Sequence, residues 1–145
     1  INLGFSGNGR MEIELAALLG ELDAAAYVLD CLPNLEEPLV TERAAPFVRR
    51  LREAKPDTPI VLVENVRYQD ADFVPARRAR FEASNAALRA AYERLRADGV
   101  PALHYVEGAA LLGDDDEATV DGTHCTDLGF VRIADAIEPA LRAAL

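Results

Sequence analysis

The chain is poor in sulfur, aromatic rings and histidine. Its 145 residues include 2 cysteines, 2 histidines and no tryptophan, and only 6% are aromatic. Two cysteines, Cys31 and Cys125, do not make a disulfide framework, so reduced thiols are the default interpretation. No apolar run approaches the roughly 18 residues of a membrane span. The formal net charge of -10 disfavours nucleic acids and anionic membranes as main partners.

The rest of the composition is that of a globular protein. Half of the residues are hydrophobic, leucine, valine and alanine carry the expected core, and nothing suggests extensive disorder. The length fits a single domain over residues 1–145. No signal peptide is visible, which favours a cytoplasmic location. Secretion stays open because the chain begins at Ile1 without a methionine.

Short apolar runs alternate with longer segments of helical periodicity. This alternation predicts an α/β fold with a parallel sheet and helices on both of its faces. The clearest strand is Pro59–Val63, which is continuous, rich in β-branched residues and flanked by turn residues. The other expected strands end at Gly4, Leu29 and Val106, and the expected helices carry Met11 to Leu22, Thr41 to Ala54, Phe81 to Leu95 and Leu128 to Leu141.

Three polar loops are expected to meet at one edge of this sheet. Ser6–Asn8 and Asp30–Asn34 leave the carboxyl ends of predicted strands, and Asp121–His124 follows the last strand and a short connecting helix. In parallel α/β sheets, ligands bind outside the carboxyl ends of the strands. The three loops together therefore predict a composite site.

The loop Val120–His124 places an acid three residues before a histidine. Esterase catalysis uses such a pair, because the acid accepts the Nδ1 proton and leaves Nε2 free to take a proton from a nucleophile. The spacing alone arises by chance in many surface loops, so its weight depends on its partners. The other histidine, His104, lies within a predicted strand, where a packed core role is favoured.

Two further residues are candidate donors to a developing oxyanion. Gly7 is either a turn glycine with a positive φ or a backbone N–H donor. Asn34 is either an ordinary turn asparagine or a side-chain amide donor, which is typically worth about 3–4 kcal/mol in the transition state. The glycines around Gly7 match neither a G-x-S-x-G nucleophile elbow nor a phosphate-binding G-x-G-x-x-G.

The sequence predicts no metal and no cofactor. The acidic run Asp114–Glu117 lacks the glycine and the spaced oxygen ligands of a calcium loop, which favours a solvated loop. Glu64 and Asn65 follow the central strand and are secondary candidates for lining the site.

Three segments together resemble the SGNH (GDSL-like) hydrolases, and most closely their bacterial lipase/acylhydrolase branch. They are Asn2–Asn8, Leu29–Asn34 and Asp121–Gly129, and their order and spacing cover essentially the whole chain. The resemblance implies a flavodoxin-like three-layer α/β/α sandwich. It also implies ester hydrolysis or acyl transfer through an acyl-enzyme, without a cofactor. By that resemblance, Gly7 and Asn34 are oxyanion-hole donors, His124 is the general base and Asp121 orients it.

The sequence departs from that family at two points. Cys125 stands where the family usually has a proline after its histidine, which changes the rigidity of the loop and removes no catalytic group. The family's nucleophile is also missing, because the only serines are Ser6, in the oxyanion segment, and Ser84, on a predicted helix. We therefore expect the nucleophile in a Gly-x-Ser turn upstream of Ile1.

The absent segment is expected to include a strand. In the family's fold the first strand lies inside the sheet, between the strand that ends here at Gly4 and the strand that ends near Leu29. Without it, two strand edges are unpaired and apolar surface is exposed. We expect a segment outside the present numbering to fill that slot.

Two other functions stay open at this point. In the first, the chain is a non-catalytic fragment or binding module on the same fold. It would hold the oxyanion groups and perform no chemistry. A thiol mechanism pairs a histidine with Cys31 or Cys125, which is chemically competent but matches no nucleophile position of the family. The two thiols are alternatively a rim disulfide under oxidation. Lipid, carbohydrate and small-metabolite esters all remain candidate substrates.

Overall fold

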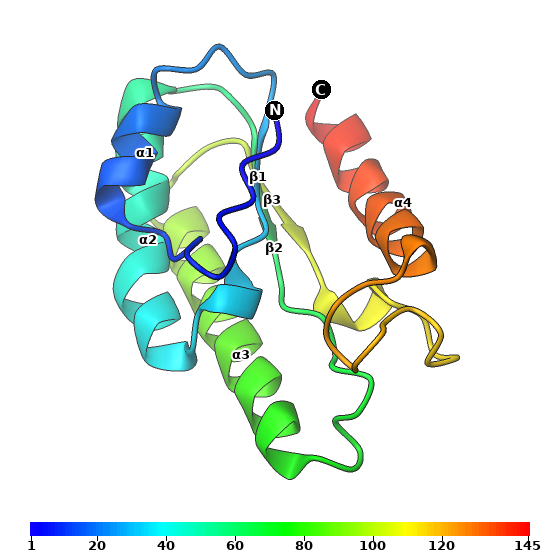
Figure 1. The fold of residues 1–145 in the computed structure, drawn as a ribbon. Helices are drawn as coiled ribbons and strands as arrows, with labels where there is room; N and C mark the ends of the chain where they lie inside the picture. The colour runs from blue at the N-terminus through cyan, green and yellow to red at the C-terminus, as the bar shows by residue number, and fades with distance from the viewer.

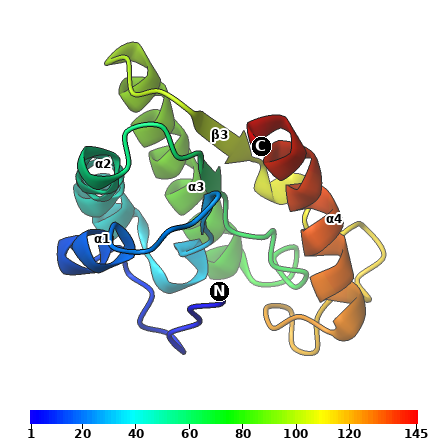
Figure 2. The ribbon, with the colours of Figure 1, turned by 90° about the horizontal axis from the view of Figure 1, so that it is seen from above.

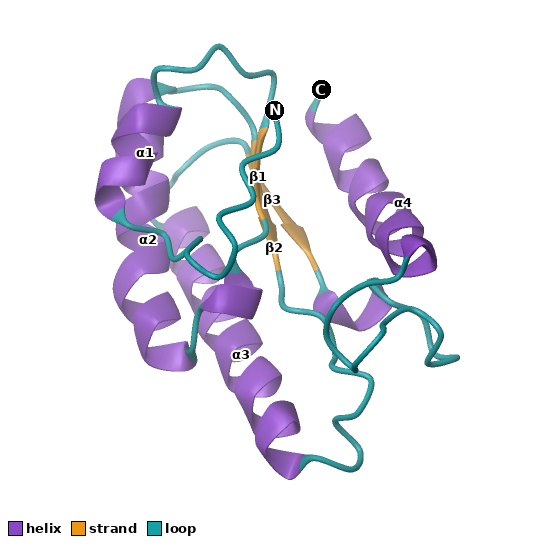
Figure 3. Ribbon diagram, viewed as in Figure 1, coloured by secondary structure: helices purple, strands orange, loops and turns teal.

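The computed structural model describes residues 1–145 as an α/β fold built on a small parallel sheet (Figure 3). The sheet has the order β1-β2-β3, and both pairs of neighbouring strands are parallel. Its strands are β1 (Tyr27–Leu29), β2 (Ile60–Val63) and β3 (Leu103–Val106), and the α-helices are α1 (Ile13–Leu19), α2 (Glu37–Ala54), α3 (Pro75–Ala97) and α4 (Asp127–Ala144).

The helices cover the two faces of the sheet in a three-layer arrangement. Figure 2 shows α1, α2 and α3 on one side of the sheet and α4 on the other. The central strand β2 is buried along its whole length, as expected for a parallel strand with a layer on each face. Ile60 and Leu62 pack with α1, α2 and α3, while Val61 and Val63 pack on the side of α4. The predicted fold class is confirmed.

The carboxyl ends of all three strands point to the same edge of the sheet (Figure 1). A 3-10 turn, η1 (Leu32–Asn34), follows β1, and another, η2 (Gly108–Ala110), follows β3. A loop without regular structure joins β2 to α3. The loop that holds Asp121 and His124 lies at this edge as well, between η2 and α4 (Figure 1).

The predicted strand at Ile1–Gly4 is wrong. Residues 1–10 have no helix or strand, and they share no backbone hydrogen bond with β1. Figure 1 shows this segment as a coil that leads from the N-terminus into α1. A strand forms only when a neighbouring backbone pairs with it, and here a cavity of about 720 Å³ is lined jointly by residues 1–5 and by β1.

One face of β1 is uncovered. Tyr27 and Leu29 are buried toward α1 and α2, whereas Val28 points the other way and is 41% exposed. The helix on that side, α4, packs mainly on β3 and β2. The sheet therefore ends at β1 with an open backbone edge and an exposed apolar side chain.

The remaining predicted elements are confirmed, with shifts at their ends. The second helix begins at Glu37 rather than near Thr41, because Pro38 occupies its first turn, where no backbone N–H is needed. Met11 is buried just before α1 instead of within it. None of the helices combines the length and apolar character that a bilayer crossing requires.

Candidate active site

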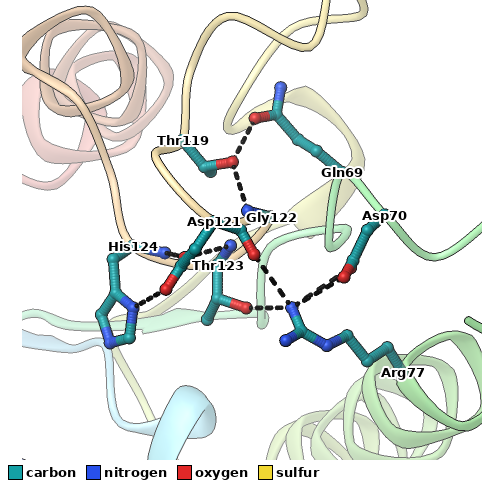
Figure 4. A network of polar contacts seen from close by, with 8 residues as sticks. All are labelled: Gln69, Asp70, Arg77, Thr119, Asp121, Gly122, Thr123 and His124. Carbon is teal, nitrogen blue, oxygen red and sulfur yellow. Dashed lines mark hydrogen bonds and ion pairs between the residues drawn. The ribbon is translucent and has the colours of Figure 1, made fainter.

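The acid and histidine of the loop before α4 are in direct contact. Asp121 Oδ2 lies 2.7 Å from His124 Nδ1. Asp121 Oδ1 accepts hydrogen bonds from the backbone N–H of Thr123 (3.0 Å) and of His124 (2.8 Å). Figure 4 shows both carboxylate oxygens used in this way. One carboxylate thus fixes the histidine ring and the backbone that carries it.

These contacts set the charge and the tautomer of the pair. Hydrogen bonds from the backbone and ring of His124, followed by the N–H of Thr123, hold the pKa of Asp121 well below its ordinary range. An ionised carboxylate only accepts hydrogen bonds, so Nδ1 of a neutral His124 carries the proton and Nε2 is left as the base. The His124 side chain is 80% exposed, and Nε2 has no partner within the chain.

The loop is closed at its base by backbone and side-chain contacts. Val120 N–H donates to the carbonyl of His124 at 2.8 Å, and Thr126 N–H donates to the carbonyl of Ala118 at 2.9 Å. The Thr126 hydroxyl caps α4 by accepting from the N–H of Gly129. Because α4 begins only three residues after His124, this cap fixes the downstream end of the loop.

Gly7 lies at the tip of a tight turn. Ser6 and Gly7 have φ values of 46° and 85°, and Asn8 N–H donates to the carbonyl of Phe5 at 3.1 Å. Positive φ at both central residues is typical of a type I′ turn and favours glycine. Arg10 Nε donates to the carbonyl of Gly7 (3.1 Å), whereas the N–H of Gly7 has no acceptor within the chain.

Asn34 ends η1 with an unused side-chain amide. Its backbone N–H donates to the carbonyl of Cys31 at 3.0 Å, and its side chain has no hydrogen-bond partner in the chain. An ideal Cβ on Gly9 lies 3.6 Å from Asn34 Nδ2, which places this amide against the segment that contains Gly7. Asn34 and Gly9 also line the cavity beside β1.

Electrostatics link the end of β1 to the loop of His124. Burial and then the charge of Asp30 raise the pKa of both cysteine thiols, to about 12 for Cys31. Asp30 follows β1, and Cys125 follows His124. A shared influence of Asp30 on both thiols means that these two segments lie within electrostatic range of each other.

The thiols are poor candidates for the nucleophile. Both cysteines are free, so the structure contains no rim disulfide. The thiolate is the reactive form, and a raised pKa reduces its population at neutral pH. The raised pKa values of both thiols therefore disfavour a Cys–His mechanism at either position.

The two serines and the second histidine differ in their surroundings. Ser84 is buried within α3, where its hydroxyl donates to the carbonyl of Phe81 at 3.1 Å. Ser6 occupies the turn beside Gly7. His104 is half-buried on β3 and makes no side-chain hydrogen bond.

Glu64 and Asn65 are used to hold the fold together. Glu64 accepts hydrogen bonds from the Tyr105 hydroxyl (2.6 Å) and the N–H of Gly108 (2.8 Å). Asn65 is fully buried, and its amide donates to the Tyr68 hydroxyl at 3.0 Å. Glu64 is engaged through both carboxylate oxygens, whereas Asn65 Oδ1 is buried and has no hydrogen-bond partner.

The acidic loop before the site is engaged by an arginine. Arg132 Nη1 and Nη2 each contact a carboxylate oxygen of Asp115 at 2.6 Å, and these hydrogen bonds lower the pKa of Asp115. No group of three histidine, cysteine, aspartate or glutamate side chains is placed to hold a metal ion.

Arg77 contacts the loop of Asp121 and His124, although no sequence pattern singles it out. Arg77 Nη1 donates to the Thr123 hydroxyl at 2.8 Å and to the carbonyl of Asp121 at 3.3 Å (Figure 4). The contacts span 46 and 44 residues of sequence. No local spacing signals such a contact.

The chain is similar to several known proteins over nearly its whole length. The model of the GDSL-like Lipase/Acylhydrolase family matches residues 1–142. The crystal structure of a protein described as a GDSL-like lipase from Bacteroides ovatus superposes with a TM-score of 0.94 at 40% sequence identity. The match covers 99% of this chain and 43% of that one.

A second solved structure shares the fold alone. It is the salicylyl-acyltransferase SsfX3 from a tetracycline biosynthetic pathway, with a TM-score of 0.71 and 23% identity. That match covers 93% of this chain and 42% of the other. The chain therefore spans less than half the length of both structures. No curated protein sequence matches it.

Proposed function

The chain belongs to the GDSL-like lipase/acylhydrolase family, and from this premise we propose that it forms the acid–base and oxyanion-hole part of a serine esterase. The enzyme hydrolyses a carboxylic ester through an acyl-enzyme. His124 takes the proton of the nucleophilic serine, and Asp121 holds His124 in the required tautomer. The single observation that carries the proposal is the 2.7 Å contact between Asp121 Oδ2 and His124 Nδ1, with Nε2 left unpaired.

The oxyanion hole in this proposal uses Gly7 and Asn34. The unpaired N–H of Gly7 and the unpaired Nδ2 of Asn34 are the two donors for the tetrahedral intermediate. Their fixed dipoles stabilise the negative charge that develops on the carbonyl oxygen. His124 then returns its proton to the leaving alcohol, and water cleaves the acyl-enzyme by the reverse sequence of proton transfers.

The nucleophile is proposed to come from a strand and turn outside residues 1–145. The cavity of about 720 Å³ beside β1 supports this, since it adjoins an open strand edge and lies among residues 1–5. Tyr27 N–H donates to the carbonyl of Pro59 (2.9 Å), so alternation along the strand turns the backbone of Val28 to the open edge. A parallel strand there pairs with Val28 and ends at the same edge as the other strands.

Ester hydrolysis by the full-length protein tests the catalytic proposal. We expect p-nitrophenyl esters to be cleaved, and we expect His124→Ala to lower kcat by about 10⁴-fold or more. The matched control is His104→Ala, which removes the other histidine and leaves kcat near that of the parent. Full activity in His124→Ala contradicts the mechanism. No hydrolysis of any ester by the parent protein instead favours a non-catalytic binding module on this fold.

Hydrogen exchange tests the proposed strand. In the full-length protein the amide of Val28 should be protected to a degree similar to that of Leu62, on the central strand. Rapid exchange at Val28 in the full-length protein means that nothing pairs with this edge. That result contradicts the proposed position of the missing strand.

A further inference from the structure

Two arginines near the start of α3 reach the two loops that carry the proposed site residues. Arg77 Nη1 donates to the Thr123 hydroxyl at 2.8 Å and to the carbonyl of Asp121 at 3.3 Å. Arg80 Nη2 donates to the carbonyl of Pro33 at 3.1 Å, one residue before Asn34. One helix therefore contacts both the acid–base loop and the turn that presents the asparagine amide.

We propose that Arg77 is a positioning residue for the Asp121–His124 pair, and that Arg80 plays a lesser, parallel part for Asn34. The inference rests on the proposed function of those three residues. Neither arginine touches the reacting atoms in this account. Each holds the backbone or a side chain of a loop whose own residues perform the chemistry.

The guanidinium of Arg77 is itself fixed in place. Asp70 Oδ2 lies 3.0 Å from Arg77 Nη1, and the guanidinium carbon lies 5.9 Å from the centre of the Tyr68 ring. The Arg77 and Asp70 side chains are only 38% and 31% exposed. Tyr68 and Asp70 both lie in the loop between β2 and α3, so Arg77 joins the acid–base loop to that segment.

The acid–base loop is held to the β2–α3 loop at two further points. Gln69 N–H donates to the carbonyl of Gly122 at 3.0 Å. The Thr119 hydroxyl donates to Gln69 Oε1 and accepts from the N–H of Gly122 at 3.0 Å. Figure 4 shows Gln69 and Arg77 contacting this loop, with Asp70 paired to Arg77 behind it. Arg77 is the only charged donor among them.

The position of this loop decides the position of the base. Asp121 binds the His124 ring through one oxygen and the backbone N–H groups of the loop through the other. Any shift of the loop backbone is therefore passed to the imidazole. A misplacement of about 1 Å costs roughly 100-fold in rate when a reaction depends on near-attack geometry.

The helix also supplies a matched control residue. Arg77 and Arg80 are three residues apart and so share a face of α3. Arg78, between them, pairs only with Asp72 and contacts neither loop. Arg78→Met thus removes an arginine and an ion pair from the same helical turn without disturbing the proposed site.

Steady-state kinetics of the full-length enzyme test the assignment. We expect Arg77→Met to lower kcat by about 10- to 100-fold with little change in KM. Arg77→Lys should recover part of this loss, because an ammonium group still donates to Thr123. Arg80→Met should give a smaller fall in kcat, and Arg78→Met should behave as the parent. Rates are referred to folded enzyme, with circular dichroism and the midpoint of thermal unfolding measured for each variant, so that partial unfolding does not imitate a loss of positioning.

A double-mutant cycle with Thr123→Val separates positioning from general stability. If Arg77 acts through this loop, the combined loss in kcat is smaller than the product of the two single losses. Independent, multiplicative losses, or equal effects of Arg77→Met and Arg78→Met, overturn the inference. An inactive His124→Ala beside a fully active Arg77→Met refutes the role of Arg77 and leaves the proposed function intact. A fully active His124→Ala refutes the proposed function itself.

Discussion

The acid–base loop and the turn of Gly7 are two halves of one proposed site, yet they are held in different ways. The loop of Asp121 and His124 is bound to the β2–α3 loop through Gln69 and to α3 through Arg77. The turn of Gly7 is closed mainly by contacts within its own segment, such as that from Arg10 to Gly7. The proposed acid–base half is therefore held by contacts with other parts of residues 1–145, whereas the turn of Gly7 adjoins the cavity that the proposed strand would fill.

The largest effect on kcat is expected from Asp121→Asn, in the loop that is bound to the β2–α3 loop and to α3. An amide in place of the carboxylate favours the wrong histidine tautomer, and kcat should fall by about 10⁴-fold. The measurement is kcat for a p-nitrophenyl ester in the full-length protein. Asp116→Asn, in the neighbouring exposed loop, is the control and should leave kcat unchanged. Comparable losses in both variants would mean that the loop depends on its overall charge.

The next largest effect is expected at the other half, from Asn34→Ala. Loss of one oxyanion donor typically lowers kcat by about 100- to 1,000-fold and changes KM little. Asn8→Ala removes an exposed asparagine from the turn of Gly7 and serves as the control. A rise in KM without a fall in kcat would assign Asn34 to substrate binding and not to the oxyanion hole.

Alanine substitutions at two glycines with nearly the same φ compare the two halves directly. Gly7 and Gly122 have φ values of 85° and 86°, so alanine at either costs roughly 1–2 kcal/mol in backbone strain. A Cβ on Gly7 meets nothing within 4 Å, whereas one on Gly122 lies 2.7 Å from Asp70 Cγ. We expect Gly122→Ala to lower both the midpoint of thermal unfolding and kcat by more than Gly7→Ala does. The reverse order would make the turn of Gly7 the more tightly built half.

The smallest effect concerns the thiol beside the site. With the pKa of Cys31 raised to about 12, the thiol stays protonated at neutral pH and reacts slowly. Its alkylation rate in a Cys125→Ala background should rise about tenfold per pH unit without a plateau up to about pH 10. Mass spectrometry measures this rate. A plateau near the ordinary value of 9.0 would indicate a solvated thiol, and turnover should be unaffected by Cys31→Ala in either case.

Most of the layered fold could be predicted from the sequence because its elements have strong local patterns. The run Pro59–Val63 is uniformly apolar since β2 is buried on both faces, and α4 has apolar residues at helical spacing. Ile1–Gly4 has a strand-like composition as well. Whether it forms a strand depends on a neighbouring backbone, which composition does not record.

In the candidate site, too, contacts that are local in sequence could be predicted and contacts that depend on packing could not. Asp121 and His124 are three residues apart, so a sequence pattern predicts their contact, and the structure confirms that they meet. The assignment of Gly7 and Asn34 as oxyanion donors stays a prediction. Arg77 had no sequence signal, because an arginine meeting partners more than 40 residues away depends on how α3 packs.

The most direct test is to label the full-length protein with a serine-reactive fluorophosphonate and to map the modified peptide. We expect one labelled serine, outside residues 1–145, and a large loss of labelling in His124→Ala. Labelling of Ser6 or Ser84, or labelling that does not depend on His124, would contradict it.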